Sequence, residues 1–211
     1  MSRHFHEKLE ALKQTLLAMG GLVEDQIRRV MRALLDRDDI LAQEVNAYDV
    51  EVDKRCVELL ALHQPAAGDL RFITTAMKIV TDLERIGDQA VNIAHRVLEL
   101  NREPPVKPYI DLPRMAEQAQ HMVKESLHAF VARDPHLARR VCAADDAVDG
   151  LRDQIFRELL TFMMEDARTI PRALRLILIS RFFERVADHA TNIAEMVIYL
   201  VEGHMVRHTL A

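Results

Sequence analysis

The chain has 211 residues, of which 49% are hydrophobic, 29% charged and 5% aromatic, and its net charge is −5. The abundance of Leu, Ala, Arg, Glu and Met favours helix over strand, and the lack of a long basic run argues against nucleic-acid binding. The first ten residues hold no signal-peptide core, and the longest apolar runs are too short to cross a membrane. We therefore expect a cytoplasmic protein with Cys56 and Cys142 reduced, which reaches a membrane only through partners.

Apolar residues recur at spacings of three and four along almost the whole chain, which predicts an all-α protein of six helices. The predicted helices cover approximately residues 5–36, 38–62, 69–101, 113–132, 135–165 and 171–203. Asp38, Asp69 and Asp134 stand where N-cap residues are expected. The Gly20-Gly21 pair predicts a bend in the first helix, because each Gly costs about 1 kcal/mol relative to Ala.

Four prolines fall within "REPPVKPYIDLP", the twelve residues that start at Arg102 and form the best linker candidate in the chain. We expect a first unit of residues 1–103, a linker of residues 104–112 and a second unit of residues 113–211. Short connections between neighbouring helices predict one antiparallel three-helix bundle in each unit.

The two units are copies of one sequence, as "LERIGDQAVNIA" from Leu83 and "FERVADHATNIA" from Phe183 show. Seven of the eleven residues in 84–94 are identical to those 100 positions later. Upstream the offset is 96 positions, and "ALLDRDDILAQEVNAYDVEVD" aligns there with "AFVARDPHLARRVCAADDAVD". The sequence therefore predicts two tandem, pseudo-symmetric three-helix bundles.

Each copy carries acidic pairs, four residues apart, at equivalent positions of its second and third helices. These pairs are Asp49/Asp53 and Glu84/Asp88 in the first copy, and Asp145/Asp149 and Glu184/Asp188 in the second. Residues four apart share one helix face, where like charges cost roughly 0.2–0.5 kcal/mol per pair. Residues equidistant from the turn of an antiparallel hairpin lie side by side, and both hairpins place their two pairs at matching heights. We therefore expect four clustered carboxylates in each unit.

Two interpretations of these clusters remain open. A single acidic pair is ordinarily a solvated, salt-bridged surface, whereas four pairs at matched heights favour one cation site per unit. Carboxylates without thiolates or paired imidazoles suit hard cations such as Mg²⁺, Ca²⁺ or Mn²⁺, or iron among oxygen ligands. Four further side chains return to the same helix faces and are predicted at the periphery of the sites: Asn92, Asn192, His95 and Glu195. Cys142 is expected to be a half-buried thiol and no ligand, and Asp82 is expected to pair with Lys78.

Common catalytic patterns do not occur in the sequence. It has no Gly-rich phosphate loop, no nucleophile elbow and no His-Glu-x-x-His motif. We therefore predict a protein without catalytic activity.

The repeated stretches "LERIGDQAVNIA" and "FERVADHATNIA", each with a Glu and an Asp four residues apart, resemble the PhoU family of bacterial phosphate-signalling accessory proteins, as does "HQPAAGDLR" near the start of the third helix. The resemblance covers essentially the whole chain and is specific because both copies carry the motif in register. One departure is Phe182, which stands where the first copy has Asp82. The resemblance implies a homodimeric adaptor between the ATPase subunit of the phosphate ABC transporter and a PhoR-type sensor kinase. It also implies negative regulation, with the starvation response held off when phosphate is plentiful.

The same resemblance implies metal ions at the E(D)xxxD motifs, divalent or trivalent and of unknown identity (Fe, Mn, Mg, Ca or Zn). The residues that match the motif are Glu84, Asp88, Glu184 and Asp188, and those that match the facing acids are Asp49, Asp53, Asp145 and Asp149. Two alternatives remain: a metal-dependent helical-bundle enzyme acting on phosphate compounds, and a regulator of a different phosphate permease. The intact double repeat argues against the permease regulator, because such relatives generally carry one unit.

Overall fold

The computed structural model describes residues 3–45 and 67–203, and all regular secondary structure within them is helical. The helices are α1 (Arg3–Asp36), α2 (Asp39–Gln43), α4 (Ala67–Leu100), α5 (Asp111–Ala132), α6 (Pro135–Glu165) and α7 (Ile170–Glu202), with a 3-10 turn, η1, at Ala167–Thr169. The predicted all-α fold is therefore confirmed for these residues. None of the described helices is both long and apolar enough to cross a bilayer.

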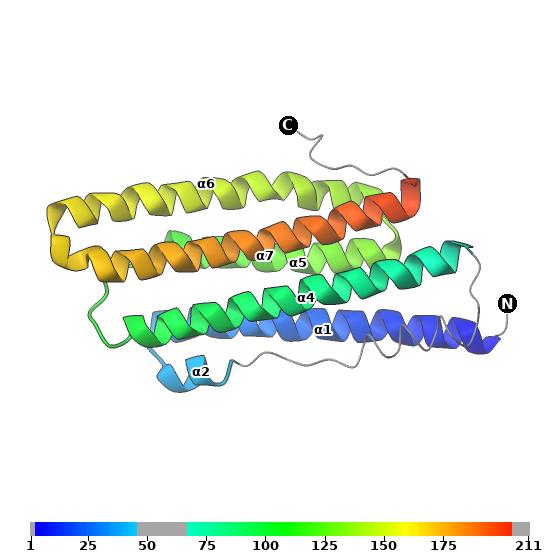
Figure 1. Ribbon diagram of the computed structural model, residues 1–211, viewed down its shortest axis with the longest axis horizontal. Helices are drawn as coiled ribbons and strands as arrows, with labels where there is room; N and C mark the ends of the chain where they lie inside the picture. The colour runs from blue at the N-terminus through cyan, green and yellow to red at the C-terminus, as the bar shows by residue number, and fades with distance from the viewer. Residues whose placement is uncertain (1–2, 46–66, 204–211) are drawn as a thin grey trace.

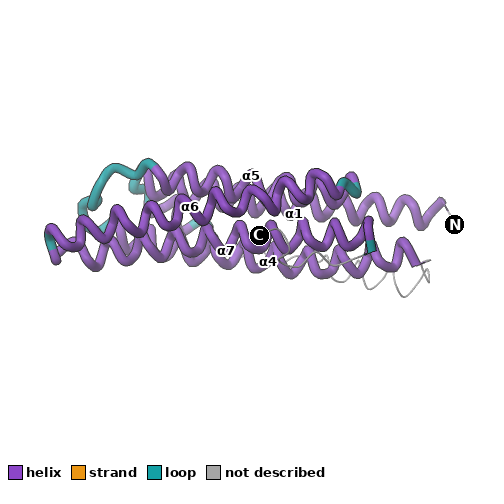
Figure 2. The backbone as a smooth tube through the Cα atoms, turned by 90° about the horizontal axis from the view of Figure 1, so that it is seen from above, coloured by secondary structure: helices purple, strands orange, loops and turns teal. Residues whose placement is uncertain are grey.

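The long helices α1, α4, α5, α6 and α7 lie along the long axis of the molecule (Figures 1 and 2). α7 packs against α4, α5 and α6, and α1 packs against α4 and α5. α4 and α7, which carry the repeated stretches that start at Leu83 and Phe183, run side by side in opposite directions (Figure 1). The buried side chains of both copies form one continuous core, in which the rings of Phe72 and Phe130 stack with their centroids 4.5 Å apart. The division into units of residues 1–103 and 113–211 stays a prediction.

The two copies repeat the same helix-ending geometry. Arg37 and Arg133, which are 96 positions apart, both adopt the left-handed conformation, with φ of 56° and 53°, as residues after a helix often do. The aspartate after each arginine then caps the next helix. The Asp38 carboxylate accepts a hydrogen bond from the amide three residues on (3.0 Å), and Asp134 accepts from the amides two and three residues on (2.9 and 3.1 Å). The N-caps predicted at Asp38 and Asp134 are confirmed, and the turn geometry follows the sequence repeat.

Two predicted helix starts and the continuity of the second predicted helix were wrong. α2 ends at Gln43; after it, Glu44 pairs with Arg29 of α1 (3.3 Å) and Val45 is buried. The predicted end of that helix, near Leu62, falls within residues 46–66, which lie outside the described part of the chain. α4 begins at Ala67, so Asp69 lies inside the helix and is not its N-cap. α5 begins at Asp111, since a proline is tolerated in the first turn of a helix.

The Gly20-Gly21 pair does not interrupt α1, which continues unbroken from Arg3 to Asp36. A Cβ on Gly20 would lie 2.1 Å from Cδ1 of Leu127 in α5, whereas a Cβ on Gly21 would meet nothing within 4 Å. Gly20 is therefore required for the close approach of α1 to α5, and Gly21 is not.

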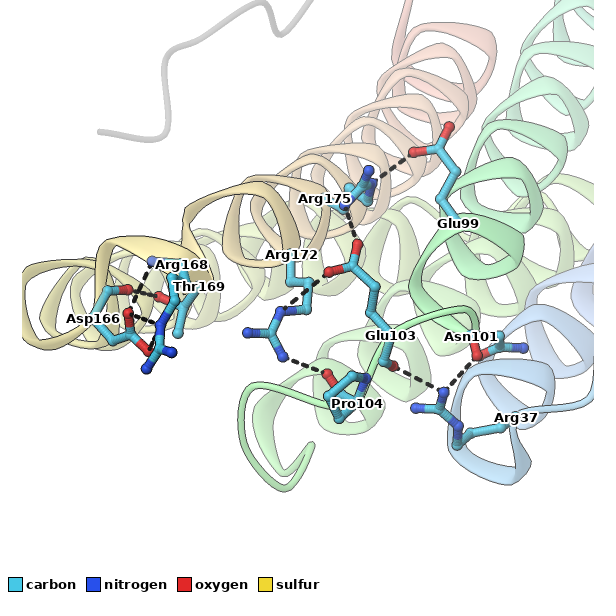
Figure 3. Close-up of polar contacts among 10 residues, drawn as sticks. All are labelled: Arg37, Glu99, Asn101, Glu103, Pro104, Asp166, Arg168, Thr169, Arg172 and Arg175. Carbon is cyan, nitrogen blue, oxygen red and sulfur yellow. Dashed lines mark hydrogen bonds and ion pairs between the residues drawn. The ribbon is translucent and has the colours of Figure 1, made fainter.

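Arginines from α7 and from the end of α1 hold the linker against the bundle (Figure 3). Arg172 donates to the carbonyl oxygen of Pro104 (2.8 Å), and Arg37 donates to that of Glu103 (2.9 Å). The Glu103 carboxylate also pairs with Arg175 (3.2 Å). The start of the predicted linker is thus ordered: Pro104 is bonded to the second copy, and Glu103, the last residue of the first unit, is bonded to both copies.

Candidate functional site

The acidic pairs of the second copy lie together on the α6–α7 hairpin. α6 supplies Asp145 and Asp149, and α7 supplies Glu184 and Asp188. The hairpin turns at residues 166–169, as the symmetry of the pairs predicts. Arg152 of α6 spans the two helices: its Nη1 lies 3.2 Å from Asp149 Oδ1 and also donates to Glu184. The facing of these pairs is therefore as the sequence predicted.

The carboxylates of this cluster disfavour one another's charge. Partial burial, followed by the charges of Asp188, Asp149 and Glu184, raises the pKa of Asp145 to about 6. Partial burial and then the charges of Glu184 and Asp149 also raise the pKa of Asp188, while Arg152 counteracts them. A carboxyl pKa rises when burial and like charges disfavour the ionised form. The site therefore carries an excess of negative charge that an added cation would relieve.

Arg152 is the residue at this site that the sequence interpretation missed. Its guanidinium bonds Asp149 and Glu184, and it also pairs with Asp153 (2.9 Å). Arg152 lies three residues after Asp149, a spacing at which helical side chains meet. The position 96 residues earlier holds Cys56. Comparison of the two copies therefore does not identify Arg152, because the first copy has no arginine at the equivalent position.

The chemistry of the donors fits a hard cation, but their present arrangement favours the arginine. Oxygen ligands are those that Mg²⁺, Ca²⁺ and Mn²⁺ prefer, and burial together with the neighbouring carboxylates raises the pKa of Asp145. Among the described residues, no three His, Cys, Asp or Glu side chains converge closely enough to hold an ion. Arg152 bonds Asp149 and Glu184 from the same guanidinium nitrogen. An ion at this cluster would have to displace Arg152 from Glu184.

The acidic cluster of the first copy can be described only in part. Glu84 and Asp88 are both exposed on α4. Asp49 and Asp53, which were predicted to face them, lie outside the described residues. The first cluster stays a prediction.

The predicted periphery of the two sites is divided between half-buried and exposed side chains. Asn92 and Glu195 are half-buried, whereas Asn192 and His95 are exposed. Burial, then the negative charges of Glu195 and Asp145, raises the pKa of the Cys142 thiol to about 11. The thiolate is the form that binds metals, so a metal at Cys142 would have to displace the thiol proton; that Cys142 is no ligand stays a prediction.

Asp82 pairs with His189 of α7 and not with Lys78. The Asp82 Oδ1 and His189 Nδ1 atoms are 2.8 Å apart, and both side chains lie between the two copies. The expected partner was wrong because spacing along α4 reveals only local neighbours, whereas the observed partner comes from the other copy. Asp82 therefore belongs to the α4–α7 contact and not to the acidic cluster.

Comparison with known proteins identifies related sequences over nearly the whole chain. Residues 16–97 and 112–197 each match the family model described as PhoU domain. The chain is 45% identical over 216 residues to the phosphate-specific transport system accessory protein PhoU homolog of Pseudomonas aeruginosa, covering 99% of this chain and 89% of that protein. It is 44% identical over 209 residues to the protein of the same description from Aquifex aeolicus, covering 96% and 95%.

Two solved structures share the fold. The crystal structure of PhoU from Pseudomonas aeruginosa aligns with a TM-score of 0.88 and 45% identity, covering 95% of this chain and all of that one (100%). The crystal structure of the phosphate transport system regulatory protein PhoU from Streptococcus pneumoniae aligns with a TM-score of 0.85 and 28% identity, covering 96% and 99%.

Proposed function

This chain belongs to the PhoU family, and we propose that it is a non-catalytic accessory protein of phosphate transport and phosphate-starvation signalling. One observation carries the proposal: both copies match the family, and relatives that are 44–45% identical over nearly their whole length are named as accessory proteins of phosphate-specific transport. The doubled acidic motif and the lack of familiar catalytic motifs support the same role.

The protein acts as an adaptor in the cytoplasm. It connects the ATPase subunit of the phosphate ABC transporter with a PhoR-type sensor kinase, works as a homodimer, and holds the starvation response off when phosphate is plentiful. The elongated bundle supports this role, because it presents faces of two related copies along one axis (Figure 1). Two partners can then occupy separate surfaces of the same molecule.

The acidic clusters bind metal ions in this proposal. In the second copy the ligands are Asp145, Asp149, Glu184 and Asp188, and a bound ion supplies the positive charge that these carboxylates lack. The raised pKa values of Asp145 and Asp188 support this assignment in part, because repulsion from neighbouring carboxylates adds to the larger effect of burial. A cation held at the surface could also bridge to an acidic or phosphate-bearing group of a partner.

Co-purification from cells grown in high and in low phosphate tests the adaptor role. We expect the tagged protein to recover the transporter ATPase or the sensor kinase, in amounts that depend on phosphate. Recovery of neither partner under both conditions would refute the adaptor role. Chelator-sensitive turnover of a phosphate compound that is abolished by Glu84→Gln would instead establish an enzyme.

Metal analysis of gently purified protein tests the clusters separately. We expect bound metal in the wild-type protein and its loss when Glu84, Asp88, Glu184 and Asp188 are replaced by Gln or Asn. If the wild type holds no metal and the replacements leave phosphate signalling intact, the metal assignment fails while the adaptor role stands.

A further inference from the structure

Arg152 of α6 contacts the second acidic cluster with one side of its guanidinium and Asp153 with the other. Its Nη1 lies 3.2 Å from Oδ1 of Asp149 and also donates to Glu184. Its Nε and Nη2 lie 3.0 and 2.9 Å from Oδ1 of Asp153. Asp153 is exposed and is not one of the four carboxylates of the cluster. A guanidinium is planar and carries five N–H donors in fixed directions, so it holds both sets of acids at once.

The two sets of contacts are separable, because they use different nitrogen atoms. A cation bound by Asp149 and Glu184 would replace the contacts of Nη1 alone. The contacts of Nε and Nη2 with Asp153 do not involve either of these carboxylates. Arg152 can therefore leave the cluster without losing every acidic partner.

A groove beside Arg152 gives the guanidinium room to move. It lies between α6 and α7 and has a volume of about 250 Å³. Arg152, Asp153 and Glu184 all line it, so it contains both the present partner of the arginine in the cluster and its partner outside the cluster. The Arg152 side chain is 28% exposed. A shift toward Asp153 therefore takes place in open space and not in the close-packed core.

The first copy lacks this arginine–aspartate pair, although its sequence carries the equivalent acids. At the offset of 96 positions, Cys56 is the counterpart of Arg152, and Val57 is the counterpart of Asp153. Cysteine and valine supply no positive charge. The duplicated sequence therefore does not need the pair at these positions, which points to a role that belongs to the second cluster alone.

We propose that Arg152 is a built-in cation with two positions. In metal-free protein its Nη1 compensates Asp149 and Glu184, and the guanidinium withdraws to Asp153 when the cluster binds a metal ion. Asp153 is thus a positioning residue, because it retains the arginine. This inference rests on the proposed metal binding and adds its regulation: the charge of Arg152 moves from the cluster to the groove, so the surface charge between α6 and α7 depends on whether the cluster is filled.

An ordinary surface salt bridge would behave differently. Exposed ion pairs contribute little to stability, and in such a pair Asp153 would act on a metal ion through its charge alone, with or without Arg152. For an arginine with two positions, the effect of Asp153 depends on Arg152. Without Asp153 the arginine has only the acids of the cluster as partners and competes for them more strongly. A double-mutant cycle separates the two cases.

Isothermal titration with Mn²⁺ measures this coupling in four proteins: the reference, Asp153→Asn, Arg152→Met and the double variant. All four carry Glu84→Gln/Asp88→Asn, which disables the first cluster. We expect Asp153→Asn to raise the Kd for Mn²⁺ at least roughly fivefold when Arg152 is present, and by less than about twofold in the Arg152→Met protein. Couplings of this size occur between residues in contact. Equal factors in the two proteins would overturn the proposal.

Asp146→Asn is the matched control for the lost negative charge. Asp146 is an exposed acid of α6 whose charge helps to raise the pKa of Asp145, and the ion pairs of Arg152 within the described residues do not involve it. Its effect on the Kd should be the same with and without Arg152, and the thermal unfolding midpoint of each variant verifies its folding. If the effect of Asp146→Asn depends on Arg152 as strongly as that of Asp153→Asn, the role of Asp153 is wrong, because charge alone then explains the coupling.

Crystal structures of the wild-type protein with and without Mn²⁺ test the movement itself. Without the ion we expect Arg152 to bond both Glu184 and Asp153. With the ion bound we expect the contact with Glu184 to be lost and the contact with Asp153 to remain. An ion bound at the cluster while Arg152 still bonds Glu184 would overturn the proposal.

The titrations also separate this inference from the proposed function. If all four proteins bind Mn²⁺ with equal affinity, the arginine with two positions is wrong and the metal assignment stands. If none of them binds Mn²⁺, the Arg152→Met protein included, the metal assignment is wrong and this inference falls with it, while the adaptor role is untouched.

Discussion

Replacing Arg152 by Met removes the positive charge at the second acidic cluster and keeps most of the side-chain stem. The guanidinium contacts Asp149 and Glu184, and the side chains of Arg152 and Glu184 are only 28% and 23% exposed. Exposed ion pairs contribute about 0–1 kcal/mol, and removing one partner of a fully buried pair costs about 3–5 kcal/mol. For this half-buried set we expect the free energy of unfolding of metal-free protein to fall by about 1–2 kcal/mol at pH 7.

The same substitution should have the opposite effect on metal binding. An ion at the cluster competes with Arg152 for Glu184, so removing the arginine removes an internal competitor. A difference of about 1–2 kcal/mol corresponds to a roughly 5- to 30-fold lower Kd for Mn²⁺. Isothermal titration of metal-free protein measures it, in a Glu84→Gln/Asp88→Asn background that disables the first cluster.

Arg157→Met is the matched control, because Arg157 is an exposed arginine of the same helix that makes no ion pair within the described residues. It should change neither the unfolding free energy nor the Kd for Mn²⁺ beyond error. Unchanged stability and unchanged affinity in Arg152→Met would refute the competition between arginine and metal. A weaker Mn²⁺ affinity in that variant would refute it as well.

Three further predictions concern pH, packing and the linker. In the folded protein the pKa of Asp145 is about 6, against 3.8 ordinarily, so the folded state retains a proton that the unfolded state loses and stability falls as pH rises between these values. Asp145→Asn should therefore stabilise metal-free protein at pH 8 by about 1 kcal/mol, after allowance for solvent screening. At pH 4 the stabilisation should be much smaller. Urea unfolding at both pH values measures the difference. Gly21→Ala should stabilise α1 by about 0.5–1 kcal/mol. Gly20→Ala must displace the buried Leu127 and should be less stable than Gly21→Ala by about 1–3 kcal/mol. Equal melting temperatures of the two variants would contradict the close approach of Gly20 to Leu127. Arg175→Met removes two ion pairs between α7 and the end of the first copy (2.8 and 3.2 Å) and should lower the unfolding free energy by about 1–2 kcal/mol. A change in chemical denaturation below about 0.3 kcal/mol would show that these ion pairs do not fasten the end of the first copy to α7.

The sequence predicted the repeated features of the fold well, because each of them appears twice. The N-caps at Asp38 and Asp134, the α6–α7 turn and the facing of the second acidic pairs all follow from local chemistry or from hairpin symmetry. Features that occur once had no such internal check. Arg152 has Cys56 at its counterpart, and Asp82 has Phe182, so comparison of the copies could not reveal the partners of either.

The sequence also did not predict contacts between elements that are far apart along the chain. Nothing in the spacing along α1 shows that Gly20 meets Leu127 of α5, so the glycine pair was interpreted as a local bend. The pairing of Asp82 with His189 likewise joins helices whose adjacency is set by the packing of the whole bundle. Local propensity predicts which residues form a helix, while tertiary packing decides which other helix each side chain contacts.

Several buried apolar positions stay equivalent in the two copies, whereas differences occur both at the surface and in the α4–α7 contact, where Phe182 is the counterpart of the buried Asp82. Ile86 and Val186, like Ile93 and Ile193, are all buried and apolar at the offset of 100, which preserves the shared core. Among exposed positions, Thr74 and Lys78 of the first copy correspond to Leu174 and Leu178 of the second. In the sequence, Cys56 is the counterpart of the half-buried Arg152. A duplicated fold can change such positions at little cost in stability, because surface substitutions usually alter it by less than about 0.5 kcal/mol. The α6–α7 hairpin therefore combines an acidic cluster that Arg152 compensates only in part with a row of exposed apolar side chains, and the two copies present different surfaces while sharing one core.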